Sequence, residues 1–585
     1  MSFGFGFGFT KITAAIRAAF SPSSLFAANE PGVWYDPSDL STMFQDSAGT
    51  TPVTAVEQPV GLMLDKSKGL ALGPELVTNG DFSDGLNGWS NASTGGGSVS
   101  VVNGQMRMTG FNSAGNRAVV DATIPTVAGK RYRVVFNRTV VSGAGIVELY
   151  VGTTVGGATL YNQNTSFTSG SFLANDSTTY LRFRSGGAVT IDFDNISVRE
   201  LPGNHAYQTT ATSRPVLSAR YNLLTNTEQF DNSVWAKTNV TVTPNAAVAP
   251  DGTVTADRVT TSATDGLVYL PTYANSYPQP ITFSVCAKAD ASSSLTIQFT
   301  SSGNGRGATF DLNAGTCTAV VAIGTGTGVS GGVSSIAALG GNWYRCTISN
   351  ISVTDLRFPV FNVVGPSNSS IYIWGASLVP ANQASLPYQR VNTATDYDTA
   401  GFPHYLRFDG VDDWLVTNAI TPGTDKAQVF AGVRKLSDAA SDVLVELSSN
   451  FNTNMGGFVV SVTDGANTRF SAAMSNAGNS YNAAYYTDSA APLTTVNTVT
   501  LDKALSSNEI TAIRKNGADQ SLTRSYNSNT TGNFLAYPLY IGRRGGTSPP
   551  FNGHLYSLIV RFGPNLPAAT IENTEKYINT KTGAY

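Results

Sequence analysis

Hydrophobic and polar residues alternate along most of this chain, in short runs separated by clusters of glycine, asparagine and serine. The period is two in many places, for example at Tyr132–Phe136, Phe283–Ala287 and Val429–Val433. Because successive side chains of a strand point to opposite faces, this pattern predicts half-buried β-strands. Many short strands with turn signals between them are typical of sandwiches. We therefore expect an all-β protein, with helical spacing after Thr10 and in a C-terminal helix over Ala568–Thr580.

The first nine residues alternate phenylalanine and glycine, which would place every aromatic ring on one face of an extended strand. Such a face has no core of its own to cover it, and exposed it would promote aggregation. We expect residues 1–30 to form a docking segment that inserts into a partner protein; packing on its own sandwich and disorder remain alternatives. The apolar side chains that would dock are Phe3, Phe5, Phe7, Phe9, Ile12 and Ile16.

The composition limits the function classes. A length of 585 residues suits three or four domains. Only 13% of the residues are charged and the net charge is −3, which argues against a nucleic-acid partner because such proteins carry basic stripes. We see no secretory signal and no apolar run of about 18 residues that would predict a membrane span. The three cysteines lie in one segment, and we favour isolated thiols over a single disulfide.

Three separated pieces of the chain share one pattern. In order along the sequence, its motifs are Trp34–Asp39, Leu64–Ser67, Gly203–Ala206, Ser213–Leu217 and Leu406–Leu415. Joined, they resemble the opening of a concanavalin/laminin-G-like β-sandwich, of the kind common in bacteriophage structural proteins. The resemblance implies one discontinuous sandwich made of residues 31–69, 203–220 and 396–585, ending in a short helix. The alternative is three independent domains with 201–221 as a linker.

The two segments between these pieces have patterns of their own. Residues 70–202 begin with Leu76–Phe82 and Trp89 and end with Asp194–Val198, which resembles a carbohydrate-binding-module jelly roll. Residues 221–395 resemble a second jelly-roll type found in phage head-fibre and tail proteins. Insertion is tolerated at exposed loops when the ends of the inserted domain lie close together. We therefore predict three β-sandwich domains, two of them inserted in the outer one.

Clusters of aspartate suggest two candidate calcium sites. Asp409, Asp412 and Asp413 crowd one turn, where like charges repel unless they are solvated, hydrogen-bonded or bound to a cation. A hydrogen-bonded polar turn without metal is the interpretation that we favour. In the first insert, the resemblance to carbohydrate-binding modules implies a structural calcium as an alternative role for a second set of residues. These are Asp81, Asp192 and Asp194.

Aromatic and amide side chains suggest one sugar-binding candidate. The segment Asn479–Asp488 is rich in tyrosine and asparagine and breaks strand alternation, as a recognition loop would. Alternating tyrosines in a strand explain it equally well. The candidate ligand-binding residues are Tyr481, Asn482, Tyr485 and Tyr486. We expect the tryptophans to be core residues instead: Trp34, Trp89, Trp235, Trp374 and Trp414.

No pattern for catalysis stands out. A nucleophile elbow with a credible triad, a phosphate-binding loop and a spaced pair of carboxylates are all missing from the sequence. We predict a protein that is not an enzyme and has no cofactor apart from the calcium considered above. The resemblance implies a structural virion component, a tail or head fibre, spike or decoration protein, assembled in the host cytoplasm. It would bind host surface glycans, join other virion proteins through its N-terminus and form a homo-oligomer, for which we favour a trimer. The alternatives are a secreted bacterial polysaccharide-binding adhesin, a purely structural virion protein and a glycan-degrading enzyme.

Overall fold

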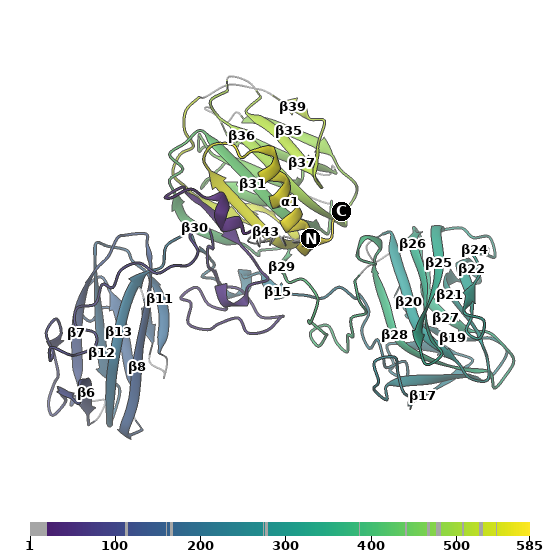
Figure 1. Ribbon diagram of the computed structural model, residues 1–585, viewed down its shortest axis with the longest axis horizontal. Helices are drawn as coiled ribbons and strands as arrows, with labels where there is room; N and C mark the ends of the chain where they lie inside the picture. Colours follow the sequence, from purple (N-terminus) through teal and green to yellow (C-terminus); the bar gives the residue numbers. More distant parts are fainter. Residues whose placement is uncertain are drawn as a thin grey trace, which may run out of the picture.

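A computed structural model describes residues 20–585, except 112–114, 145, 160, 164–167, 273, 275–278, 385, 439–440, 465–467, 476–480, 506–507, 526–530 and 546. The described chain consists almost entirely of antiparallel β-strands, which confirms the all-β prediction. Figure 1 shows three β bodies: one with β31, β43 and α1, one with β7, β8 and β13, and one with β20, β26 and β28. Each has its own hydrophobic core.

The body that contains the C-terminus has two large sheets. One sheet has the order β15 (Val216–Ser218), β29 (Tyr405–Asp409), β43 (Asn552–Phe562), β31 (Lys426–Lys435), β36 (Leu493–Asp502), β37 (Ile510–Lys515) and β38 (Ala518–Asp519), with β1 (Gly32–Tyr35) also paired to β43. The other has the order β2 (Met43–Phe44), β3 (Leu62–Met63), β14 (Ala206–Tyr207), β30 (Leu415–Ile420), β40 (Tyr537–Ile541), β32 (Asp442–Leu447), β33 (Phe458–Thr463), β34 (Arg469–Ser475), β35 (Tyr481–Thr487) and β39 (Thr523–Ser525). The hairpin of β41 (Arg543–Arg544) and β42 (Thr547–Pro550) packs on β32.

These two sheets join strands from all three separated pieces of the chain. Trp34 in β1 pairs with Ile559 in β43, and Leu217 in β15 pairs with Leu406 in β29. Tyr207 in β14 pairs with Leu62 on one side and Val416 on the other. Short pieces such as β14 and β15 cannot bury a core by themselves, and here they obtain one from the C-terminal strands.

The first intervening segment forms a sandwich of two five-stranded sheets. One has the order β10 (Tyr161–Gln163), β9 (Val147–Gly152), β12 (Thr178–Ser185), β7 (Val119–Pro125) and β4 (Ser90–Asn91). The other has the order β11 (Ser169–Leu173), β8 (Arg131–Gly143), β13 (Val189–Glu200), β6 (Gln105–Gly110) and β5 (Ser98–Val102). Trp89 lies in the core between them, where its ring packs on Phe82 and Phe183.

The second intervening segment forms another two-sheet sandwich. One sheet has the order β16 (Ala236–Thr238), β19 (Gly266–Tyr269), β27 (Phe358–Val363), β21 (Ser294–Ser301), β22 (Asn304–Asp311) and β23 (Thr316–Cys317), with β24 (Val321–Ile323) also paired to β22. The other has the order β17 (Val240–Ala247), β18 (Ala256–Thr261), β28 (Ser370–Pro380), β20 (Ile281–Ala289), β26 (Trp343–Val353) and β25 (Val329–Gly340). Trp235 and Phe230 fill its core. Cys286, Cys317 and Cys346 are free thiols, and the first and last of them are buried.

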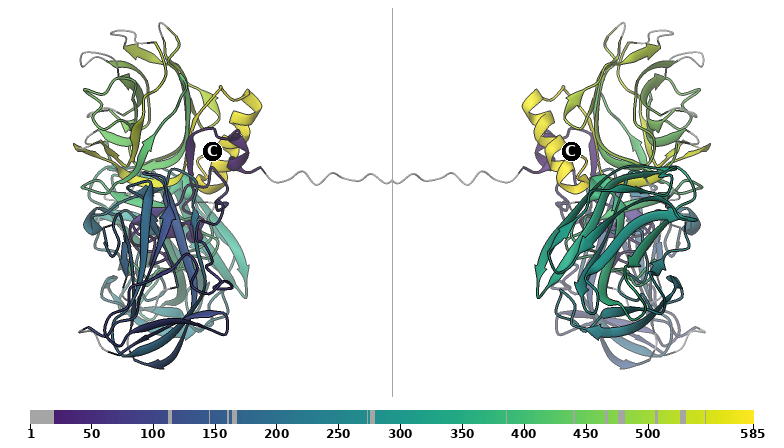
Figure 2. Two further views of the ribbon diagram at one scale, coloured as in Figure 1. Left: turned by 90° about the vertical axis from the view of Figure 1, so that its left-hand side faces the viewer. Right: turned by 90° about the vertical axis from the view of Figure 1, so that its right-hand side faces the viewer.

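The predicted C-terminal helix is confirmed as α1 (Ala568–Thr582), which ends at Gly583 in the left-handed conformation. Figure 2 shows it beside the outer sandwich, where Ile578 packs on Phe430 and Ile559. A Cβ at Gly432 of β31 would lie 2.5 Å from Ile578 Cγ2, so this glycine lets the helix approach the sheet. Short 3₁₀ helices occur at η1 (Pro22–Leu25), η2 (Leu40–Thr42), η3 (Ala211–Ser213) and η5 (Ala381–Gln383). Within the described residues, no helix combines the length and apolar character that a membrane crossing requires.

Candidate functional site

The tyrosine-rich segment is a strand, so its four predicted ligand-binding residues do not form one site. In β35, Tyr481 is 46% exposed and Tyr485 is half-buried, while Asn482 and Tyr486 are buried on the opposite face. Asn482 donates to Glu509, and Tyr486 donates to Asn497 with a separation of 2.9 Å. A strand sends alternate side chains to opposite faces, so the structure corrects this prediction for Asn482 and Tyr486.

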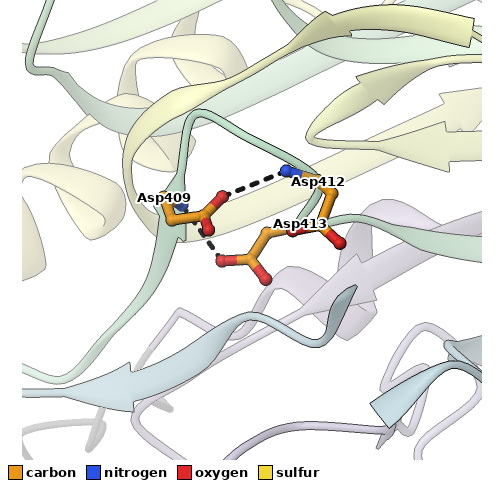
Figure 3. A group of neighbouring side chains, drawn as sticks. All are labelled: Asp409, Asp412 and Asp413. Atoms are coloured by element: carbon orange, nitrogen blue, oxygen red, sulfur yellow. Dashed lines mark hydrogen bonds between the residues drawn. The ribbon is translucent and has the colours of Figure 1, made fainter. Parts of the chain in front are cut away.

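The aspartate turn after β29 does bring its three carboxylates together, with ligand oxygens within 4.8 Å of one another (Figure 3). Asp409 Oδ1 accepts the backbone N–H groups of Val411 (2.8 Å) and Asp412 (3.2 Å). Asp413 Oδ2 accepts the N–H of Asp409 at 3.0 Å, and Asp412 Oδ2 accepts the hydroxyl of Ser213 at 2.7 Å. These hydrogen bonds account for the aspartates as turn-forming residues.

The electrostatics of this turn are nevertheless unfavourable. Burial of Asp413, together with the nearby charges of Asp409 and Asp412, raises the pKa of its carboxyl to about 7. Oxygen donors of this kind suit Ca²⁺, but each of the three carboxylates already accepts hydrogen bonds from the fold. These hydrogen bonds explain the aspartates as part of the turn, and protonation of Asp413 lowers the repulsion among them.

The second predicted calcium set is not assembled. Asp192 forms a two-point ion pair with Arg107 across β13 and β6, with both N···O distances 2.7 Å. Asp81 lies in an exposed turn and accepts the N–H and hydroxyl of Ser83, while Asp194 accepts the N–H of Asn195. Within the described chain, the only group of three or more potential ligand residues that could hold a metal is the Asp409 turn. The cross-strand arginine, which is 85 residues from Asp192, explains why the sequence could not show this neutralisation.

The predicted docking residues Phe3, Phe5, Phe7, Phe9, Ile12 and Ile16 lie outside the described residues. Phe20, the first of the described residues, packs its ring edge-on against Tyr577 of α1 with centroids 6.0 Å apart. Trp34 also contacts Tyr577 in this way, at 6.3 Å. The chain therefore enters the outer sandwich alongside the C-terminal helix.

Of the tryptophans expected in the core, Trp34, Trp89, Trp235 and Trp374 are buried. The prediction is wrong for Trp414, which is only half-buried. Its ring stacks on Tyr540 with centroids 5.6 Å apart, and Arg543 lies over it at 6.0 Å. The residue precedes β30 next to the aspartate turn, where turn geometry rather than strand alternation decides its direction.

A face that the sequence reasoning missed lies on the first jelly roll, on the sheet of β9, β12 and β7. Arg182 in the middle strand pairs in register with Asp121 on one side and Tyr150 on the other. The next residues of β12 on this side of the sheet are Arg184, which pairs with Glu148, and Tyr180, which pairs with Gly152. We call this set the charged–aromatic face; its members are Asp121, Glu148, Tyr150, Tyr180, Arg182 and Arg184.

The charged–aromatic face is rigid because its side chains bind one another. Arg182 donates to both carboxylate oxygens of Asp121 at 2.6 and 2.8 Å, a two-point geometry that fixes the guanidinium plane. Arg184 donates to Glu148 at 2.5 Å and lies over the Tyr150 ring, 4.6 Å from its centroid. Burial raises the pKa of the Tyr150 phenol, so that phenol stays neutral and donates to Glu148.

The reverse side of the same strands explains this orientation. Leu181 and Phe183 alternate with Tyr180, Arg182 and Arg184 along β12 and are completely buried in the jelly-roll core. The hydrophobic side thus fixes which residues point outward, leaving planar guanidinium, carboxylate and phenol groups partly exposed on the open sheet face. Alternation at 178–185 is the signal that could have identified this face from sequence.

Polar cavities lie elsewhere among the described residues. One, of about 490 Å³ in the second jelly roll, is lined by Glu228, Asp257, Asn232 and other polar residues. Burial raises the pKa of Asp257 to about 6 and also raises that of Glu228. Asp257 accepts the backbone N–H groups of Phe230 (2.8 Å) and Asn245 (3.0 Å), so its carboxylate is part of the fold. Another cavity, of about 420 Å³, lies where the first jelly roll meets the outer sandwich.

Comparison with known proteins identifies no family. No family model matches the sequence, and no curated protein matches it. Parts of the fold are similar to solved structures: the receptor-binding domain of botulinum neurotoxin type G (12% identity, 30% of this chain and 43% of that domain, TM-score 0.22), the CBM40 of Ruminococcus gnavus IT-sialidase bound to α2,3 sialyllactose (12%, 28% and 84%, 0.21), and the CBM22-1–CBM22-2 tandem of Paenibacillus barcinonensis Xyn10C (12%, 56% and 99%, 0.19). The chain thus spans less than half of the botulinum domain. TM-scores this low do not indicate a function for this chain.

Proposed function

We propose that this protein binds glycans without cleaving them, through the charged–aromatic face of its first jelly roll. The single observation that carries this proposal is the row Asp121–Arg182–Tyr150 across three neighbouring strands, flanked by Tyr180 and Arg184. Phenol rings present flat apolar faces with a polar edge, and guanidinium and carboxylate groups supply donors and acceptors in fixed planes. A sugar offers the matching surfaces, C–H faces and a rim of hydroxyl groups.

The geometry favours binding over hydrolysis. On this face each carboxylate is held by an arginine: Asp121 by Arg182 and Glu148 by Arg184. A glycosidase needs one carboxyl group to remain protonated as an acid while a second acts as base or nucleophile. Ion pairs with arginine already occupy both carboxylates, so we infer that these groups orient the face for recognition rather than transfer protons.

The test is binding of oligosaccharides to purified protein by affinity electrophoresis, comparing Tyr180→Ala and Tyr150→Ala with the wild type. An aromatic contact contributes roughly 0.5–1.5 kcal/mol beyond buried area, so each variant should weaken binding about threefold to tenfold. Tyr485→Ala is the matched control, a half-buried tyrosine under an arginine in the outer sandwich, with Arg469 4.3 Å from its ring centroid. Loss of binding in the control but not in the two variants would move the site to β35.

The biological setting that we propose is a virus particle, on which many copies display this face to host surface glycans. The support is the resemblance of the motifs Trp34–Asp39, Gly203–Ala206 and Leu406–Leu415 to phage structural sandwiches. Weak single sites then gain strength from avidity. Mass spectrometry of purified particles should find this chain as a stoichiometric component, attached through residues 1–30; its recovery only from culture supernatant would favour a secreted adhesin.

A further inference from the structure

The cavity between the first jelly roll and the outer sandwich has basic walls. Its lining includes Lys130 and Arg131 from the start of β8 and His205, Tyr207 and Asn418 from the outer sandwich. No aspartate or glutamate is among the residues that line it. Its volume of about 420 Å³ falls within the roughly 300–1,000 Å³ typical of small-molecule sites.

Arg131 is the unusual residue of this cavity, because it is only 6% exposed. Its Nη1 donates to the hydroxyl of Ser171 at 2.9 Å, and that hydroxyl donates to the Ala48 carbonyl of the outer sandwich at 2.6 Å. Among the described residues, no carboxylate is hydrogen-bonded to its guanidinium, and the charge of Asp46 acts on it only through space. A buried cation without an adjacent anion is costly, and burial lowers the pKa of Arg131 to about 10.

The other two basic residues that line the cavity are Lys130 and His205. Lys130 is half exposed at the rim, where its Nζ lies 3.3 Å from Glu200. His205 is buried and neutral: its Nδ1 accepts the Asp65 N–H, its Nε2 donates to the Leu201 carbonyl, and burial lowers its pKa to about 3. The positive charge of the cavity therefore comes from Lys130 and Arg131.

The cavity is held open by contacts across the junction. Asn418 Nδ2 donates to the Gly129 carbonyl at 2.9 Å, and Tyr207 donates to Asn418 Oδ1 at 3.3 Å. The hydroxyl of Ser171 also joins the two domains, through its hydrogen bond to the Ala48 carbonyl. Asn204, Tyr207 and Thr421, whose side chains carry amide or hydroxyl groups, also line the cavity. Neutral polar groups next to a cation match a ligand that carries hydroxyl groups and one anionic group.

We propose that this junction cavity binds an acidic sugar residue, whose carboxylate lies against Arg131 and Lys130. The inference rests on the proposed glycan-binding function and names a class of glycan, one with carboxylate-bearing units. The guanidinium supplies a planar fork for the two carboxylate oxygens, and the surrounding amide and hydroxyl groups bind the sugar ring. An anion here also removes the cost of the unpaired buried arginine, so binding stabilises the junction.

Saturation-transfer NMR on the full-length protein tests this inference with D-glucuronate, its neutral methyl ester, and acetate. We expect glucuronate to bind at least tenfold more tightly than the ester, since a charge-assisted hydrogen bond is worth that factor. Acetate should bind much more weakly than glucuronate, because it lacks the ring. Arg131→Gln and the substitution at the cavity rim, Lys130→Gln, should each weaken the binding of glucuronate. Arg133→Gln, which replaces an exposed arginine on the same strand as Arg131, should leave that binding unchanged.

Each contrary result has a defined meaning. Equal binding of glucuronate and its ester, or glucuronate binding unchanged in both Lys130→Gln and a folded Arg131→Gln, would overturn the proposal. Acetate as strong as glucuronate would reduce the cavity to an anion site without sugar recognition and would also overturn it. If neutral oligosaccharides still bind in a Tyr150- and Tyr180-dependent manner while glucuronate does not bind, the junction inference fails alone and the proposed function stands.

Discussion

Leu217→Ala tests whether a short central piece of the chain is an integral part of the outer sandwich. Leu217 in β15 is completely buried in the same core as Leu406 and Val429. Its backbone also binds the first piece: its N–H donates to the Gln58 carbonyl at 3.0 Å, and its carbonyl accepts the Glu57 N–H at 2.6 Å. A linker would have none of these contacts, so its truncation would be silent.

The expected cost follows from the size of the deletion. Replacing a buried leucine by alanine removes apolar burial and leaves a cavity, at about 2–5 kcal/mol. For a domain of roughly 150–250 residues, each kcal/mol lowers the melting temperature by about 2–4 °C. We therefore expect one thermal transition, that of the outer sandwich, to fall by roughly 4–20 °C while the transitions of the two jelly rolls stay in place.

Differential scanning calorimetry of the full chain measures this directly. Val134→Ala, at a buried position in the first jelly roll, should shift a different transition, and Val411→Ala, at a 72% exposed position, should shift none. If Leu217→Ala leaves every transition unchanged, residues 203–220 are a linker and the discontinuous sandwich is wrong. If it shifts the same transition as Val134→Ala, the pieces belong to a different unit.

Three further outcomes are expected. The pKa of Asp413 is raised to about 7, so the folded state holds this proton more tightly than the unfolded chain, and the free energy of unfolding falls as the pH rises from about 4 to about 7. The urea midpoint should fall over this pH range in the wild type and fall less in Asp413→Asn. Identical pH dependence in the two proteins would contradict the assignment. EDTA should leave the melting temperature unchanged, because the carboxylates of the Asp409 turn are bound by the fold; a fall that Ca²⁺ reverses would show a metal site. Thiol reagents should label the partly exposed Cys317 before the buried Cys286, whose pKa burial raises to about 11, and Cys286 labelled as fast as Cys317 in native protein would contradict its burial.

Period-two alternation predicted the strands well because one set of alternate side chains lies in a core, whether the other set is partly exposed, as in β12, or buried as well, as in β20. Phe283 and Val285 of β20, for example, are fully buried, as expected. The same rule exposes the error at β35: the composition of Asn479–Asp488 suggested a loop, but alternation places Asn482 and Tyr486 inside. Where a residue lies in a turn, as Trp414 does, alternation gives no direction, and the sequence could not distinguish core from surface.

The candidate site was harder to predict because its contacts join distant parts of the chain. Asp121 and Arg182 are 61 residues apart, and only strand register brings them together. Arg131 lines the same cavity as Tyr207 and Asn418, although both residues come much later in the sequence. A single sequence shows such residues as scattered charges. Asp409, Asp412 and Asp413 are neighbours in one turn, so the sequence could predict that their carboxylates lie close together.

The most direct test of glycan recognition is a glycan array probed with multivalent protein, in the wild-type form and as a Tyr150→Ala/Tyr180→Ala double variant. Glycan binding by an open sheet face competes with water for every hydroxyl, so single sites are weak and multivalent presentation is needed. Our account predicts selective binding by the multivalent wild type, clear loss in the double variant, and no release of reducing ends from the bound glycans. Absence of binding to any glycan, or binding that the double variant retains in full, would contradict it.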